Sequence, residues 1–91
     1  MNRREQWRPV LDTEVKKWSA KSWAELVAEL GHVEAYETEF EGAKYQVEVQ
    51  LLENTDTYVH VGVSVDDDSI LASFRPLSSS FTCEEQQRQD G

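Results

Sequence analysis

Residues 33–65 read VEAYETEFEGAKYQVEVQLLENTDTYVHVGVSV, and this stretch decides the fold. Apolar and polar side chains alternate along it in three runs, which Glu41-Gly42 and Asn54-Thr55-Asp56 separate. Alternation with a period of two is typical of strands that bury one face, and Gly, Asn and Asp are typical of turns. The stretch therefore predicts an antiparallel meander with strands at residues 33–40, 43–52 and 58–65.

The turn between the first two strands predicts their register. If Glu41-Gly42 is the whole loop, Phe40 faces Ala43, and every second pair after it lies on the same side of the sheet. On the opposite side Lys44 then faces Glu39, which is a favourable charge pair. The predicted pairs are Phe40–Ala43, Glu39–Lys44, Thr38–Tyr45, Glu37–Gln46, Tyr36–Val47, Ala35–Glu48 and Glu34–Val49.

The third predicted strand carries valines at alternate positions. We expect Val59, Val61, Val63 and Val65 to be buried, and Tyr58, His60, Gly62 and Ser64 to be exposed. Continuing the pattern across the turn pairs Leu52 with Tyr58, or extends the ladder one step to Glu53 and Thr57. In that register His60 lies opposite Gln50 and diagonal to Glu48.

Beyond the meander the pattern is shorter. Alternating apolar residues at 70–74 predict a fourth strand, which Pro76 ends. We expect residues 76–80 to form a loop, and Phe81 and Cys83 to lie in a last short edge strand.

The first third of the chain predicts two short helices. Asp12 is a favourable N-cap residue, and Glu14 lies in the first turn, where the helix dipole favours an acid. Leu11, Val15 and Trp18 recur at the spacing of one helical face. Two serines would interrupt that face if the helix continued, so we expect it to break at residues 19–22.

The second helix is predicted at residues 23–30. The segment Ser22-Trp23-Ala24-Glu25 matches a capping box, in which Ser22 binds the third backbone amide and Glu25 reaches back to the amide of Ser22. Gly31 follows the last helical residue and suits a left-handed C-cap.

These elements predict an α+β fold, with two short N-terminal helices packed on one face of a three- to five-stranded antiparallel meander. The other face is expected to be exposed. The predicted organisation is a flexible arm over residues 1–11, a single domain over residues 12–83 and a disordered tail over residues 84–91, which contain no apolar side chain.

The charge is negative and unevenly distributed. The chain of 91 residues has a net charge of −9, and residues 31–83 contain ten acidic and two basic side chains. Such a surface repels nucleic acid and anionic lipid, keeps a protein soluble and attracts basic proteins. We therefore expect no nucleic-acid or membrane partner, a basic protein as the partner class, and a monomer or a weak homodimer formed through an exposed edge strand.

The sequence also predicts a cytoplasmic location. The first residues lack the apolar run of a signal peptide, and no run approaches the roughly 18 apolar residues that span a bilayer. The single Cys83 cannot form an intrachain disulfide.

No motif points to catalysis, a metal or a cofactor. Phosphate- and dinucleotide-binding glycine motifs are absent, and Asp66-Asp67-Asp68 lacks the ligand spacing and glycine of a calcium loop. Cys83 has no histidine nearby in the sequence, and the serines at 78–80 lack the nucleophile-elbow pattern. We expect no catalytic, cofactor-binding or metal-binding residues.

The exposed sheet face remains as the candidate site. It is predicted to contain Glu37, Glu39, Gln46, Glu48, Gln50, Tyr58 and His60. A histidine diagonal to a glutamate could act as an acid–base pair, but a flat face offers no pocket that excludes water.

Three interpretations follow. The first is a non-enzymatic interaction module that docks a basic protein on the acidic face. The second is an ordinary solvated surface. The third is a small ligand-binding or enzymatic domain whose site lies between the helices and the sheet, with Trp18 or Trp23 as a wall.

The pattern YQVEVQLLENTDTYVHVGVSVDDDS at 45–69, followed by SFRPLSSSF at 73–81, resembles a group of short bacterial hypothetical proteins of unassigned function. The resemblance extends over most of residues 12–83. It implies a compact cytoplasmic α+β domain and no particular activity.

Overall fold

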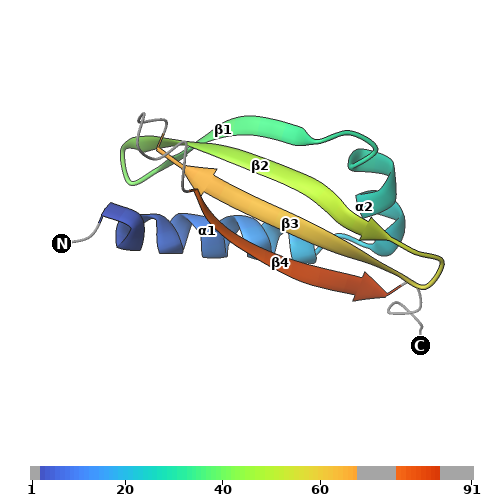
Figure 1. Ribbon diagram of the computed structural model, residues 1–91. Coiled ribbons are helices and arrows are strands. Elements are labelled where there is room, and N and C mark those ends of the chain that lie inside the picture. Colours follow the sequence, from blue (N-terminus) through green and yellow to red (C-terminus); the bar gives the residue numbers. More distant parts are fainter. Residues whose placement is uncertain (1–2, 68–75, 85–91) are drawn as a thin grey trace.

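The computed structural model describes residues 3–67 and 76–84. The helices are α1 (Arg3–Ser19) and α2 (Trp23–Glu29), and the strands are β1 (Glu34–Phe40), β2 (Ala43–Asn54), β3 (Tyr58–Asp66) and β4 (Leu77–Glu84). The strands form one antiparallel sheet in the order β1-β2-β3-β4, and both helices lie on the same face of it (Figure 1). The predicted α+β fold is confirmed.

The β1–β2 hairpin has the predicted register at all of its pairs, starting from Phe40 opposite Ala43. Both turn residues have positive φ, 52° at Glu41 and 83° at Gly42. Positive φ at both central residues is the signature of a type I′ turn, whose twist matches that of the strands it joins. A two-residue turn thus fixes the face on which each side chain of β1 and β2 lies.

The register between β2 and β3 differs from the prediction. A bulge between Leu51 and Glu53 places Glu53 opposite His60, while Gln50 faces Gly62. The prediction that put His60 opposite Gln50 is therefore wrong. A bulge adds one residue to one strand, which a strict alternation in the sequence does not reveal.

The β2–β3 turn also differs from the prediction. The Thr55 backbone N–H donates to the Tyr58 carbonyl at 2.9 Å, and the Tyr58 N–H donates to the Thr55 hydroxyl at 3.0 Å. These bonds close the turn, and β2 extends to Asn54. The predicted pairings of Leu52 with Tyr58 and of Glu53 with Thr57 are both wrong, because Glu53 faces His60 and Asn54 faces Val59.

β4 takes the place of an expected loop. The sequence predicts a loop at 76–80, but the strand begins at Leu77 and pairs with β3 in one unbroken register. Serine has a low intrinsic preference for strands, so pairing with β3 decides the conformation of the serines at 78–80. Pro76 precedes the strand, where its missing N–H is tolerated.

Other predictions for the C-terminal third are met in part. Phe81 and Cys83 lie in a strand, as predicted, and that strand is an edge of the described sheet. Glu84, the first residue of the predicted tail, is the last residue of β4. The strand predicted at 70–74 and the rest of the predicted tail lie outside the described residues.

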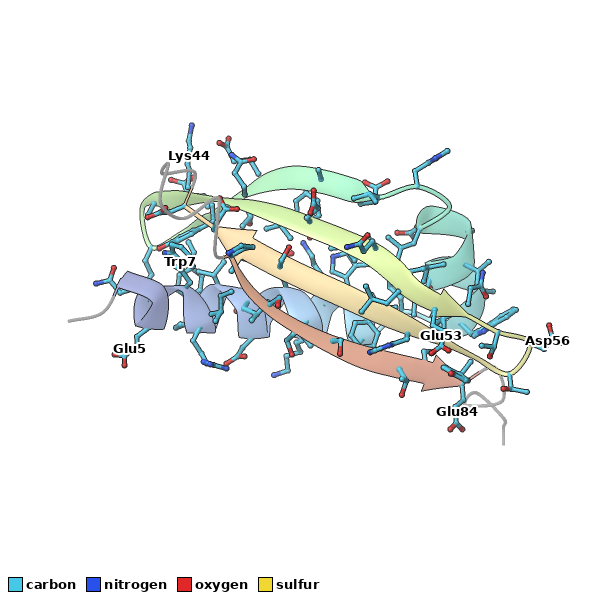
Figure 2. All side chains as sticks on the ribbon, viewed as in Figure 1. Glu5, Trp7, Lys44, Glu53, Asp56 and Glu84 are labelled. Atoms are coloured by element: carbon cyan, nitrogen blue, oxygen red, sulfur yellow. The ribbon has the colours of Figure 1, made fainter. Side chains whose placement is uncertain are left out.

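The N-terminal segment is helical over most of the range for which the sequence predicts a flexible arm. α1 begins at Arg3, and Trp7, Val10 and Leu11 are 2%, 1% and 1% exposed. Figure 2 shows Trp7 between α1 and the sheet. Pro9 lies inside the helix, where it removes a hydrogen bond at a cost of about 3 kcal/mol. Burying three large side chains, each worth about 1.5–3 kcal/mol, offsets that cost.

The break between the helices is confirmed. α1 ends at Ser19, and α2 begins at Trp23 with the predicted capping box. The Glu25 N–H donates to the Ser22 hydroxyl at 3.1 Å, and the Ser22 N–H donates to a Glu25 carboxylate oxygen at 2.9 Å. The prediction of a left-handed Gly31 is wrong, because Gly42 is the glycine with positive φ among the described residues.

The core lies between the helices and the inner face of the sheet. Its centre is the row of β3 valines, which are all 0–1% exposed, as predicted. The buried apolar residues are Trp7, Val10, Leu11, Trp18, Leu26, Leu30, Tyr45, Val47, Val49, Val59, Val61, Val63, Val65 and Cys83.

A buried carboxylate joins α1 to β1. Glu14 is 3% exposed, accepts a hydrogen bond from the Tyr36 hydroxyl and pairs with Lys17 Nζ at 3.0 Å. The Trp18 indole N–H donates to the same hydroxyl at 2.8 Å. Burial, and then the bond to Glu14, raises the pKa of Tyr36 above its ordinary value. A charge on the inner face is tolerated because it is paired and hydrogen-bonded.

Replacing Gly42 with alanine should destabilise the protein, because a φ of 83° is disfavoured for a residue with a Cβ atom. We expect the free energy of unfolding, measured by urea denaturation, to fall by about 1–2 kcal/mol. Gly31→Ala is the matched control, since a Cβ there meets nothing within 4 Å, and it should raise stability by up to about 1 kcal/mol or leave it unchanged. Equal losses at both positions would contradict the type I′ turn.

Tyr36→Phe should lower the free energy of unfolding by about 1–3 kcal/mol, because it leaves Glu14 and Trp18 without their shared partner. Tyr58→Phe is the control. Its hydroxyl also donates to a glutamate, Glu53, but at an exposed position, so the expected change is within about 0.5 kcal/mol. Similar losses for both variants would show that the buried network adds no stability.

The same variants test the effect of pH. The raised pKa of Tyr36 means that folding favours its neutral phenol. The neutral phenol of Tyr36 therefore makes its full contribution to the free energy of unfolding below the ordinary tyrosine pKa of about 10. This contribution is lost as the pH rises further. The stability difference between the wild type and Tyr36→Phe should narrow in alkaline urea titrations, and a constant difference would contradict this origin.

Candidate functional site

The sheet face opposite the helices is open among the described residues. Both helices lie behind the sheet in Figure 1, and no described element covers the front. Figure 2 shows side chains along this face between Lys44 at one end and Glu53 and Glu84 toward the other. We call this surface the open face. It consists of Ala35, Glu37, Glu39, Lys44, Gln46, Glu48, Gln50, Leu52, Glu53, Tyr58, His60, Gly62, Ser64, Asp66, Ser78, Ser80, Thr82 and Glu84.

All seven predicted site residues lie on the open face, but they do not form one cluster. The acidic side chains of β1 lie at the end near Lys44, where Gln46 Nε2 donates to Glu37 Oε2 at 3.3 Å. Tyr58 and His60 lie at the opposite end, beside the β2–β3 turn. The structure therefore places the predicted residues along the length of the sheet.

His60 forms a hydrogen bond that the sequence did not predict. Its Nε2 lies 2.9 Å from the Ser80 hydroxyl on β4. Glu53, which faces His60 across the bulge, instead accepts the Tyr58 hydroxyl at 2.8 Å, and this bond raises the pKa of Tyr58. A serine next to a histidine is the core of a nucleophilic site, but catalysis also needs a third group that orients the histidine. No described residue forms such a second hydrogen bond with His60, so the pair is not a catalytic triad.

A shallow hollow lies in the middle of the open face. Its volume is about 420 Å³, and its lining comprises Gln50, Leu52, Gly62, Val63, Ser64, Ser78, Ser79 and Ser80. Leu52 continues the outward alternation of Gln46, Glu48 and Gln50, so it lies on the open face, where it is 52% exposed. Its methyl groups lie over Gly62, which has no side chain.

The apolar wall and the serine rim of this hollow were not among the predicted site residues. A glycine at an outward position in a strand is a signal of close approach by another group, and Gly62 carried that signal. Strand periodicity also placed Leu52 outward, but the pairing that adds β4 had no comparable signal. A second hollow of about 270 Å³ shares Ser64 with the first and extends toward Ala35 and Glu48.

Other candidate residues do not assemble into a site within the described ranges. No group of three metal-ligating side chains occurs there, and Asp68 of the aspartate run lies outside them. Cys83 is a free, buried thiol, and burial, followed by the charge of Glu84, raises its pKa. A raised pKa lowers the thiolate fraction and so the reactivity of the thiol.

The region between the helices and the sheet is largely filled by core side chains. Trp18 is 5% exposed, and its indole N–H is bound by Tyr36. The Trp23 indole nitrogen is buried without a hydrogen-bond partner. A hollow of about 360 Å³ lies at the margin of this region and is lined by Gln6, Pro9, Phe40, Glu41, Ala43 and Tyr45.

Comparison of the chain with protein-family models, with curated proteins and with solved structures gave no match. The fold and the site define a small α+β protein that presents one face of a four-stranded antiparallel sheet. Neither described helix is both long and apolar enough to cross a membrane.

The contact between Leu52 and Gly62 can be tested by a double-mutant cycle. A Cβ atom on Gly62 would lie 3.0 Å from Leu52 Cδ1, so Gly62→Ala requires the leucine to move. In a Leu52→Ala background this conflict is absent, and the alanine should stabilise the strand by about 0.5–1 kcal/mol. We expect a coupling energy of at least about 0.5 kcal/mol in a double-mutant cycle of unfolding free energies. Additive effects would mean that Leu52 does not lie over Gly62.

Proposed function

We propose that this protein is a non-enzymatic interaction module that docks a basic protein partner on its open face. The observation that carries the proposal is the exposed Leu52 and its hollow within an acidic surface. Binding sites of this kind join a central apolar contact to a charged rim that sets orientation and association rate.

The charges of the open face support a basic partner. Glutamates lie on two sides of the hollow: Glu37 and Glu48 toward β1, and Glu53 and Glu84 toward the end of the sheet that carries the β2–β3 turn. Lys44, at the far end, is the basic side chain on the described part of this face. Such a field attracts cations and disfavours nucleic acid and anionic membranes as partners.

The low relief of the face supports a protein rather than a small molecule as the partner. Small-molecule sites bury most of their ligand in a concave pocket, whereas the hollow at Gly62 is shallow and lies between serine side chains. A cytoplasmic location belongs to the same proposal, because Cys83 is a free thiol.

The alternative function, a ligand or enzyme site between the helices and the sheet, has less support. Two observations favour it: the Trp23 indole nitrogen without a partner, and the hollow of about 360 Å³ at the margin of that region. The other polar groups in that layer, Glu14, Trp18 and Tyr36, already bind one another.

Charge reversal at matched positions tests the proposal. The partner would first be captured from lysate at low ionic strength and purified, and its dissociation constant would then be measured by calorimetry. Glu48→Lys should weaken binding about fivefold or more, because it places a like charge against a basic surface. Asp12→Lys makes the same change at an exposed position of α1, away from the open face, and should leave affinity within about twofold.

Salt provides the second measurement. Binding should weaken as ionic strength increases, since salt screens the attraction between exposed charges. Equal weakening by Glu48→Lys and Asp12→Lys would exclude the open face as the site. Affinity that does not depend on salt would exclude a basic partner.

A further inference from the structure

The outer edge of β4 is a surface that the proposed docking on the open face does not use. β4 is the last strand of the described sheet, and within residues 3–67 and 76–84 no strand pairs with its outer side. Each residue from Leu77 to Glu84 pairs with β3 without a bulge, so the strand is regular along its whole length. A regular edge presents a row of backbone donors and acceptors that another strand can bind.

The two edges of the sheet differ in charge. β1 carries Glu34, Glu37 and Glu39 among its seven residues, and charges of this kind prevent another strand from pairing. β4 has no charged side chain from Leu77 to Cys83, no proline and no bulge. Charged side chains, one of the devices that protect an edge strand, are therefore present on β1 and absent from residues 77–83 of β4.

We propose that two copies of this chain associate through β4, antiparallel about a two-fold axis at Ser80, to form one continuous eight-stranded sheet. The partner at this edge is inferred to be a second copy because the strand is self-complementary. Pairing about Ser80 places Leu77 opposite Cys83, Ser78 opposite Thr82, and Ser79 opposite Phe81 of the other copy. Each pair joins two uncharged side chains.

The same register keeps the faces of the two sheets aligned. Leu77, Ser79, Phe81 and Cys83 all lie on the helix side of β4, and each would face another member of this set across the axis. Leu77 and Phe81 are partly buried in a single copy and would gain a neighbour. The open faces would remain uncovered and would form one wider acidic surface.

The overall charge determines how this association responds to salt. Each copy has a net charge of −9, so two copies repel each other, and the uncharged β4 edge is where they can approach most closely. Salt screens that repulsion, so the dimer should become tighter as ionic strength increases. Docking of a basic partner has the opposite salt dependence, so the two proposals can fail separately.

Sedimentation of the purified chain alone, from micromolar to millimolar concentration, tests the dimer. The wild type should show a monomer–dimer equilibrium that shifts toward dimer in high salt. Ser80→Glu and Ser80→Lys place like charges against each other at the axis, and each should weaken self-association about tenfold or more. An equimolar mixture of the two variants should restore dimerisation, because opposite charges then face each other.

Ala35→Glu and Ala35→Lys are the controls, since Ala35 is an exposed residue of the other edge strand. They should not change the dimerisation constant, and circular dichroism would verify that all variants are folded. Both Ser80 variants lose the hydrogen bond to His60, so restoration on mixing cannot arise from that bond. A monomeric wild type at every concentration and salt would overturn the proposal. A mixture of the two Ser80 variants that stays monomeric would also overturn it. If the Ala35 variants weakened self-association as much as the Ser80 variants do, the contact between copies would lie elsewhere, and the proposal would be wrong.

Discussion

The rest of the structure depends on the burial of one row of side chains, the alternate valines of β3. Val59, Val61, Val63 and Val65 are all 0–1% exposed, and they lie on the central part of the sheet beneath the helices. Each fully buried valine contributes about 1.5–3 kcal/mol through the hydrophobic effect. Because successive side chains of a strand point to opposite faces, burial of this row forces His60, Gly62 and Ser64 outward. The inner and outer faces are thus set by a single constraint.

Polar contacts align α1 with the sheet. The apolar core of a small protein does not by itself fix the angle of a helix, whereas a hydrogen bond to a buried carboxylate is directional. The bonds of Tyr36 with Glu14 and Trp18 join β1 to α1 at defined points. We attribute the position of α1 to this network and to the burial of Trp7.

The middle of the outer face is shaped by a leucine and a glycine on neighbouring strands. Leu52 lies outward by strand alternation, and it can lie over Gly62 because the glycine has no side chain. The bulge beside Leu52 turns Glu53 onto the same face, opposite His60. The same surface is bordered by two unlike edges, one acidic and one uncharged. Docking on the face and pairing along β4 would therefore use separate parts of the molecule.

The sequence alone determined the features that depend on neighbouring residues. The capping box of α2, the break after Ser19 and the complete register of β1 with β2 were all predicted, because a cap or a two-residue turn leaves few alternatives for the adjacent chain. The seven residues predicted for the exposed face do lie there, since strand periodicity assigns each side chain to a face.

Tertiary structure decided what depends on contacts between distant segments. The helical N-terminus forms around Pro9 because Trp7 and Leu11 are buried in the core, and local preference gave no sign of this. The serines at 78–80 are in a strand because β3 offers them a partner. His60 meets Ser80 for the same reason, and Glu53 faces His60 because of a bulge. Local sequence restricts each segment to a few conformations, and the choice among them is made by burial and pairing with residues far away in the chain.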